Sequence, residues 1–203
     1  MGLYSNLIFP YCIDFTMSGS DLSEYRQQLL ADVSGNVLEI GFGTGLNLPY
    51  YPDKINKITT IDPNPGMRRR ARSRIEKSGI TVDYKVLNGE SIPIADASFD
   101  SVVCTWTLCS IPRVDRAIAE IYRLLKPSGK FFFIEHGLSR DNSIQVWQNR
   151  LTPVQKIIAD GCHLNREIGT IVKRQFVNVT TEQFYAPKLP KLIGYMYKGV
   201  AIK

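Results

Sequence analysis

The chain has 203 residues, of which 44% are hydrophobic and 22% are charged, so it can bury one core and is neither disordered nor collagen-like. We therefore expect a single domain spanning residues 1–203. The net charge is +6, but we find no helix-turn-helix, zinc-finger or aromatic RNA-reading motif. We expect no nucleic-acid partner, and contact with a membrane surface is the alternative role for the basic residues.

The apolar runs and the cysteines exclude further classes. No apolar run approaches the roughly 20 residues that span a bilayer, and the first fifteen residues lack the basic start of a secretion signal. The four cysteines share no CxxC spacing, so we expect reduced thiols and no metal site. These features predict a cytoplasmic protein, with peripheral membrane contact as an option.

The first 32 residues precede the first predicted strand and include the apolar, aromatic stretch Leu3–Met17. Phe9, Tyr11 and Phe15 in this stretch could cover a bound apolar ligand. We interpret residues 1–32 as a helical lid or a membrane-surface segment. A terminal helix packed on the domain is the alternative.

Short apolar runs that alternate with helical periodicity predict βαβ units around a mostly parallel sheet. The predicted parallel strands are Asn36–Ile40, Lys57–Ile61, Thr81–Leu87, Phe99–Cys104 and Lys130–Glu135. The predicted helices are Gly66–Lys77, Val114–Leu125, Ser143–Asp160 and Glu167–Lys173. Two late strands, Asn178–Tyr185 and Ile193–Ala201, should form an antiparallel edge hairpin. The expected fold is an α/β, doubly wound, mostly parallel seven-stranded sheet with helices on both faces.

The strongest local signal is a buried strand that runs into the glycine-rich loop Gly41-Phe-Gly-Thr-Gly45. Gly41, Gly43 and Gly45 permit a tight turn and close approach of a ligand to the backbone. Glu39, just before the turn, would repel a phosphate, which favours a cationic or zwitterionic cofactor over a dinucleotide. Asp62 ends the next strand and follows Gly41 at the spacing, roughly 20 residues, of a ribose-binding carboxylate.

The stretch from this loop to Asp100 resembles the class I S-adenosylmethionine-dependent methyltransferases. In that superfamily the loop holds the methionine part of the cofactor, the acid after the second strand binds the ribose, and residues after the third strand bracket adenine. The resemblance implies cofactor-binding roles for Glu39, Gly41, Phe42, Gly43, Gly45, Asp62, Pro63, Asn88, Gly89, Glu90, Thr105 and Trp106. Asn88 replaces the usual aspartate, and its amide oxygen can still accept from adenine; a turn-forming role is the alternative.

Further motifs narrow the resemblance, namely Pro49-Tyr-Tyr-Pro52, Leu108-Cys-Ser110, Glu135-His136 and Asp160-Gly-Cys-His163. Together they are similar to the methyltransferase-like group that includes animal alkyl-thiol S-methyltransferases. This similarity implies S-adenosylmethionine as donor, S-adenosylhomocysteine as product and a small apolar thiol as acceptor. Related bacterial sequences overlap with quinone and phospholipid-amine methyltransferases, so those acceptors remain alternatives.

Methyl transfer from a sulfonium is an in-line displacement, which needs alignment and, for a thiol, a base or positive charge that favours the thiolate. The candidates lie at and after the end of the fifth strand because ligands bind at the carboxyl edge of such sheets. They are His136, Glu135, Asp160 and His163. His136 is the better base by its ordinary pKa. A structural role is the alternative for each, and we interpret Cys162 as structural because direct transfer needs no protein nucleophile.

Two other functions fit part of the pattern. An NAD-dependent oxidoreductase would use the same loop and Asp62, but Glu39 and the early third glycine, Gly45, disfavour it. A module that binds S-adenosylmethionine without turnover is the second alternative. The whole pattern predicts a methyltransferase.

Overall fold

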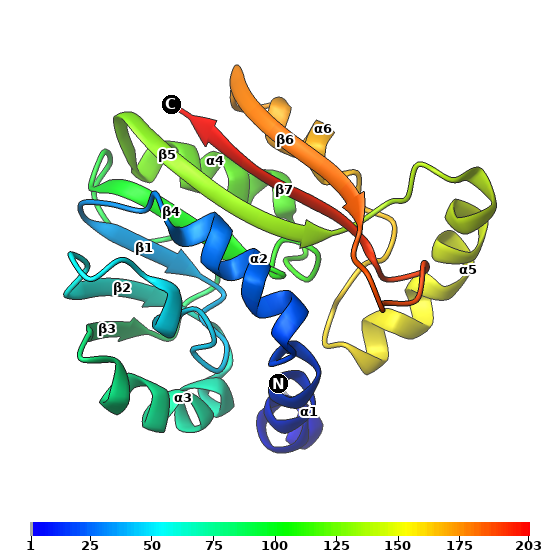
Figure 1. Cartoon of the computed structure of the whole chain (residues 1–203), viewed down its shortest axis with the longest axis horizontal. Helices are drawn as coiled ribbons and strands as arrows, with labels where there is room; N and C mark the ends of the chain where they lie inside the picture. Colours follow the sequence, from blue (N-terminus) through cyan, green and yellow to red (C-terminus); the bar gives the residue numbers. More distant parts are fainter. Residues whose placement is uncertain (1) are drawn as a thin grey trace.

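A seven-stranded sheet forms the centre of the molecule in a computed structural model that describes residues 2–203 (Figure 1). The strand order is β3-β2-β1-β4-β5-β7-β6. Five strands run parallel, namely β1 (Val37–Ile40), β2 (Lys57–Ile61), β3 (Thr81–Lys85), β4 (Phe99–Thr105) and β5 (Leu125–His136). The last two, β6 (Asn178–Tyr185) and β7 (Tyr195–Ile202), are antiparallel, with β7 between β5 and β6. The predicted doubly wound sheet with an antiparallel edge hairpin is confirmed.

Helices cover both faces of this sheet and close a separate apolar core on each (Figure 1). One core contains residues of α2 (Ser20–Leu30) and α3 (Pro65–Ser78), and the other contains residues of α4 (Val114–Leu124) and α6 (Ile168–Lys173). Phe132 belongs to the first core and Phe133 to the second, because successive side chains of a strand point to opposite faces. One helix pair therefore packs against each face of the sheet.

Four element boundaries differ from the expected ones by two residues or more. The third strand ends at Lys85, not Leu87, because the N–H of Leu87 turns back onto the carbonyl of Lys85. The fifth strand begins at Leu125, which pairs with Phe99 before a bulge, and Ser128 within this stretch has a φ of +63°.

The other two differences have equally local reasons. The last strand starts at Tyr195, not Ile193, because the N–H groups of Ile193 and Gly194 bond the carbonyl of Pro190 and close a turn. The long helix α5 (Asn142–Ile158) ends two residues before the predicted Asp160, whose φ of +46° cannot continue a helix.

The N-terminal segment contains three helical pieces, which are a π-helical turn at Tyr4–Ile8, α1 (Phe9–Met17) and α2. Met1, part of the segment predicted as a lid, lies outside the described residues. The helix α1 lies on the side toward which the parallel strands point (Figure 1). Within residues 2–203 every helix is too short or too polar to cross a membrane.

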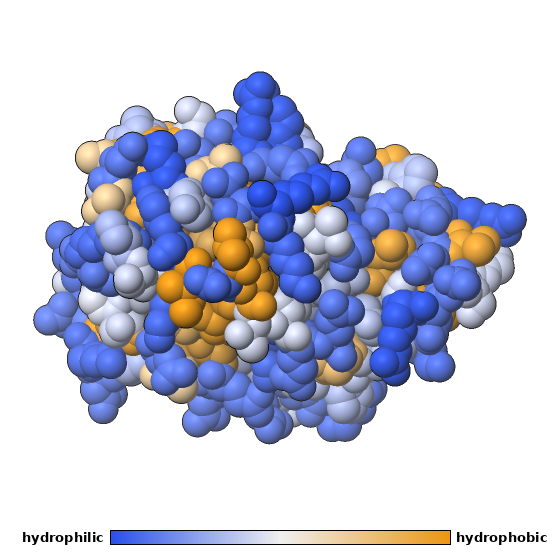
Figure 2. Space-filling view, turned by 90° about the horizontal axis from the view of Figure 1, so that it is seen from above, coloured by the Kyte–Doolittle hydropathy of each residue, from blue (hydrophilic) through white to orange (hydrophobic). Residues whose placement is uncertain are grey.

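Most of the exposed large apolar side chains belong to two groups. Figure 2 shows an apolar area where β7 ends and β6 begins, and the exposed Val177 and Ile202 belong to these segments. The second group lies on the N-terminal helical pieces and α5 and consists of Leu3, Tyr4, Leu7, Ile8, Tyr11, Phe15, Val146, Trp147, Val154, Ile157 and Ile158. The Tyr4 hydroxyl donates to the carbonyl of Ile158 at 2.7 Å, so the two elements of this second group adjoin.

Candidate functional site

The glycine-rich loop after β1 has a backbone that glycine adopts most readily. Gly41, Gly43 and Gly45 have φ angles of +75°, +54° and +77°. A side chain at Gly41 would collide with Thr107, whereas a methyl group built on Gly43 would meet no neighbouring atom closer than 3.9 Å. Gly41 is thus required for packing, and Gly43 leaves space in which a ligand can approach the backbone.

Three other predicted cofactor residues flank this loop. Phe42 is buried with its ring against Tyr84, at a centroid distance of 5.8 Å, so it supports the loop from the core. Thr105, at the end of β4, accepts a hydrogen bond from the Asn47 amide at 3.1 Å. Pro63 is exposed.

Glu39 is a fully enclosed carboxylate at the end of β1. It accepts hydrogen bonds from the Asn47 amide at 2.8 Å and from the Tyr51 hydroxyl at 2.7 Å. Burial raises the pKa of Glu39 from 4.5 to about 7. Its hydrogen-bond donors are both neutral, and a cationic ligand group beside Glu39 would favour the ionised carboxylate.

Asp62 joins the end of β2 to the glycine-rich loop. One carboxylate oxygen accepts the N–H of Gly43 and the other accepts the N–H of Asn64, both at 2.8 Å. Burial raises the pKa of Asp62 from 3.8 to about 6. Because each carboxylate oxygen has two lone pairs, Asp62 can accept from two ligand hydroxyls without releasing the loop.

In the predicted adenine segment, residues 88–90, the polar side chains form hydrogen bonds within the protein. The Asn88 side chain accepts the N–H of Glu90 at 3.1 Å, which is the turn-forming role weighed above. The Glu90 carboxylate accepts the backbone N–H of Arg113 at 2.9 Å and its guanidinium at 2.7 Å. Gly89 is buried, and a methyl group built on it would lie 3.1 Å from the Ile40 side chain, which is a tight contact.

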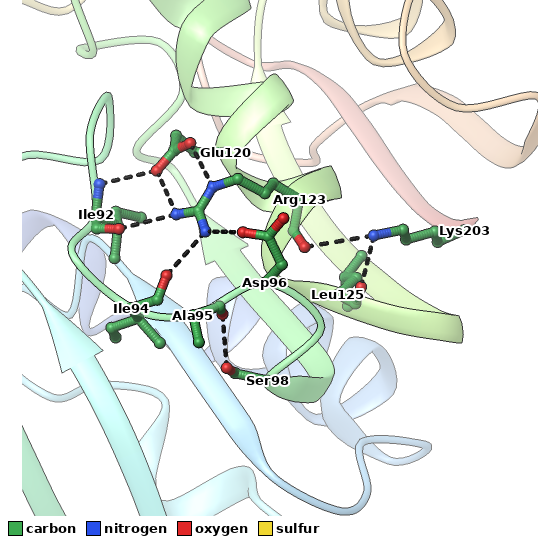
Figure 3. A network of polar contacts seen from close by, with 9 residues as sticks. All are labelled: Ile92, Ile94, Ala95, Asp96, Ser98, Glu120, Arg123, Leu125 and Lys203. Carbon is green, nitrogen blue, oxygen red and sulfur yellow. Dashed lines mark hydrogen bonds and ion pairs between the residues drawn. The ribbon is translucent and has the colours of Figure 1, made fainter.

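The residues that follow this segment are anchored to α4 (Figure 3). Arg123 donates to the carbonyls of Ile92 and Ile94, both at 2.8 Å, and pairs with Asp96 and Glu120. Glu120 also accepts the N–H of Ile92 at 2.8 Å. This network fixes the loop between β3 and β4, and with it the position of residues 88–90.

Arg26 of α2 is a candidate site residue that the sequence analysis missed. Only 3% of Arg26 is exposed, and its Nε and Nη1 atoms have no hydrogen-bond partner among the described residues. Burial lowers the pKa of Arg26 to about 10. The available signal was its helical spacing, because Arg26 shares the buried face of α2 with Leu22, Leu29 and Leu30.

Trp106 lies against this arginine. The Arg26 guanidinium lies 4.7 Å from the centre of the Trp106 ring, and the indole Nε1 is buried without a partner among the described residues. Trp106 has a φ of +48°, which is strained for a bulky residue and is seen most often at functional sites. A buried unpaired cation beside a strained aromatic residue indicates a binding site for an anionic ligand group.

The N-terminal segment is tied to the same edge of the sheet. Asp14 of α1 accepts the hydroxyl of Thr44 at 2.6 Å and pairs with Arg70 and Arg74 of α3. The Ser5 hydroxyl donates to Asp160 at 2.7 Å, and the Ser5 carbonyl accepts from the Asn64 side chain at 2.7 Å. The segment therefore bridges the end of β2 and the chain that follows α5.

Glu135, near the end of β5, has a buried carboxylate that forms hydrogen bonds with the loop after β4. It accepts the backbone N–H groups of Thr107 at 2.7 Å, Leu108 at 2.8 Å and Cys109 at 3.3 Å. Burial raises the pKa of Glu135 to about 6, and these three donors oppose the rise. The carboxylate fixes the loop after β4, where the predicted Thr105 and Trp106 begin.

His136 meets two cysteines that are distant in sequence. Its Nε2 lies 2.9 Å from the sulfur of Cys162, and one ligand atom each of Cys109, His136 and Cys162 lie within 4.8 Å of one another. The Nδ1 of His136 is buried without a partner among the described residues. His163 instead donates its N–H and its Nδ1–H to the carbonyl of Cys109, at 2.9 Å and 3.1 Å.

Comparison with known proteins identifies the class. The methyltransferase domain family matches residues 38–133. Thiol S-methyltransferase TMT1B of Rattus norvegicus is 39% identical over 173 residues, which cover 82% of this chain and 70% of the rat protein. The chain belongs to the class I S-adenosylmethionine-dependent methyltransferases.

Two further comparisons bear on the methyltransferase as a whole. Thiol S-methyltransferase TMT1A of Homo sapiens is 34% identical over an alignment of 221 residues that covers 100% of this chain and 90% of the human protein. An S-adenosylmethionine-dependent methyltransferase of Thermotoga maritima has the same fold, with a TM-score of 0.67 over 98% of both chains at 22% identity. Relatedness thus extends beyond the matched domain to both chain ends.

The site described above fits the cofactor of this class. S-adenosylmethionine supplies an activated methyl group on a sulfonium, together with a ribose, an ammonium and a carboxylate. Asp62 offers acceptors to the ribose hydroxyls, Glu39 offers a carboxylate to the positive charge, and Arg26 offers unpartnered donors to the carboxylate, while Gly43 leaves open space for the ligand. What this methyltransferase itself must do is bind, orient and exclude water.

Proposed function

We propose that this methyltransferase acts on a small apolar thiol. The observation that carries the proposal is the contact of His136 with Cys162 and its neighbour Cys109 at the carboxyl edge of β4 and β5. A thiol acceptor reacts as its thiolate, and a protonatable or cationic group beside it favours that form. The thiol S-methyltransferases among the relatives support the same acceptor.

The cofactor roles follow the geometry of the loop. Asp62 would accept the ribose hydroxyls and Gly43 would leave room for the methionine part. Arg26, whose two nitrogens lack partners, would meet the carboxylate, and the ionised Glu39 would attract the positively charged part of the cofactor. Asn88 would hold the adenine segment in its turn while its amide group faces solvent or adenine.

The acceptor roles differ among the four candidates. His136 would promote the thiolate form of the acceptor. Glu135 is a positioning residue because its carboxylate already accepts three backbone N–H groups. Asp160 and His163 are positioning residues too, since Asp160 holds Ser5 of the N-terminal segment and His163 holds the backbone of Cys109.

The N-terminal segment would serve both as a cover for the site and as a membrane contact. Phe15 of α1 is 85% exposed, and Ile157 of α5 is 79% exposed, which is unfavourable in water but suits the interface of a bilayer. An apolar acceptor dissolved in the lipid could then reach the site from that side. Such a protein would work in the cytoplasm, at the membrane surface.

Vesicle co-sedimentation tests this contact. Phosphatidylcholine vesicles should bind the wild type and bind the Phe15→Ser, Ile157→Ser double variant at least about tenfold less. A Val177→Ser variant, altered at the edge hairpin, serves as the control. Equal binding of the double variant and wild type would remove the membrane role.

An acceptor panel tests the main proposal. Purified protein and methyl-labelled cofactor are given an alkyl thiol, a quinol or phosphatidylethanolamine at equal concentration. Turnover of the thiol supports the proposal, and turnover of a rival without the thiol replaces it with a quinone or phospholipid-amine methyltransferase. Cofactor binding in calorimetry with no product from any acceptor would support a binding module instead.

A further inference from the structure

We propose that Cys109, His136 and Cys162 bind one zinc-class metal ion, which leaves a fourth position for the acceptor sulfur. The assignment of the acceptor sulfur as the fourth ligand rests on the proposed function. The binding of the ion by the three protein ligands does not. The sequence spacing predicted no metal site, because the three residues lie on three separate segments and form no spaced motif. The fold brings them together.

The ligand set and the distances suit such an ion. Two thiolates and one imidazole form the combination that selects zinc or a similarly soft ion. Bonds of about 2.3 Å to sulfur and about 2.0 Å to nitrogen place tetrahedral ligand atoms roughly 3.5–3.8 Å apart. The three ligand atoms here lie within 4.8 Å of one another. The 2.9 Å contact between His136 and Cys162 must lengthen to admit the ion.

The backbone around the ligands is already fixed by other contacts. Glu135 accepts the N–H of Cys109 at 3.3 Å, and the carbonyl of Cys109 accepts the N–H of His163, the residue after Cys162, at 2.9 Å. The two cysteine segments therefore hold each other in place. Groups of this kind, which orient ligands from behind, raise metal affinity.

Three protein ligands define the kind of site. Structural zinc sites have four protein ligands, whereas catalytic ones have three and keep an open position. An acceptor thiol at that position gives up its proton to solvent and binds as a thiolate. Its sulfur lone pair forms the new C–S bond to the methyl carbon while the sulfonium C–S bond breaks, so no electron is gained or lost by the ion.

Cobalt titration of the reduced protein tests the site without cofactor or acceptor. We expect one Co²⁺ per chain, with a thiolate-to-cobalt charge-transfer band and the visible bands of a tetrahedral ion, both displaced by Zn²⁺. Changing an outer neighbour of a metal ligand commonly costs 10–100-fold in affinity, so Cys162→Ser and Cys109→Ser should lose at least about 100-fold. The Cys12→Ser variant, altered at an exposed cysteine, should titrate like wild type.

A second measurement covers variants that fail to fold. In the wild type, Zn²⁺ should protect Cys109 and Cys162, but not Cys12, from alkylation as followed by peptide mass spectrometry. Absence of the cobalt band, its persistence in Cys162→Ser, or a Cys109–Cys162 disulfide in freshly purified protein would each overturn the metal site. Thiol methylation would then still stand or fall by the acceptor panel alone.

Discussion

Asp14 of α1 accepts a hydrogen bond of 2.6 Å from the hydroxyl of Thr44, in the middle of the glycine-rich loop. The same carboxylate binds Arg70 and Arg74 of α3, and only 4% of Asp14 is exposed. The N-terminal helices are thus fastened to the loop that we propose receives the cofactor. A displacement of Thr44 would therefore break the contact with Asp14 and disturb the N-terminal segment.

Gly43→Val should abolish cofactor binding in a folded protein. The φ of +54° strains any branched residue, at roughly 1–2 kcal/mol, and the side chain would fill the space that the ligand needs. Gly79→Val is the matched control, because Gly79 has a φ of +70° and equally open surroundings at the end of α3. Calorimetry should show binding by the control alone, and normal binding by Gly43→Val would refute the loop assignment.

Arg26→Met should stabilise the free protein and weaken cofactor binding. Burying a cation whose Nε and Nη1 lack hydrogen-bond partners is costly, and methionine fills similar space beside Trp106, so the melting temperature of the free protein should rise. Loss of a charged hydrogen bond, roughly 1.5–3 kcal/mol, lowers affinity about 10- to 150-fold. A variant that loses stability and keeps its affinity would show that Arg26 is a structural residue.

The free energy of unfolding should fall as pH rises from about 4.5 to about 7. The folded-state pKa of Glu39, about 7, and of Asp62, about 6, lie above their ordinary values, so the native state holds protons that the unfolded chain has released. Urea titrations of Glu39→Gln should show a shallower fall than wild type. Glu76→Gln, at an exposed position, should match the wild-type slope; an equal slope in Glu39→Gln would contradict the shifted pKa.

His136→Ala should depress turnover of a thiol acceptor more than cofactor affinity. Its imidazole contacts the sulfur of Cys162 at 2.9 Å, where we have proposed that the acceptor binds. The defect should shrink at a pH above the pKa of the acceptor thiol, where thiolate is abundant without help. His163→Ala provides the comparison, since it is the chain's other histidine. An equal loss of turnover in both variants at all pH values would speak against a specific role.

The sequence predicted the secondary-structure elements well, but it predicted the contacts between distant side chains poorly. Alternating apolar runs specify strands and helices locally, so the order of elements and the loop at Gly43 were accessible. The contact of Cys109 with His136 and Cys162 was not, because it depends on how the segments after β4 and after α5 fold over the end of β5. Glu90 shows the same limit, since its pairing with Arg113 depends on where α4 begins.

At Trp106, backbone strain lowers stability while the indole takes part in the proposed cofactor site. Its left-handed backbone, with a φ of +48°, costs on the order of 1–3 kcal/mol in a non-glycine residue. The backbone N–H of Trp106 donates to the carbonyl of Ile134 at 2.8 Å, which helps to hold this conformation. Glycine at this position would relieve the strain but remove the indole beside Arg26. Selection for thermal stability alone should therefore replace Trp106 early. The resulting variants should be more stable and should have lower methyltransferase activity.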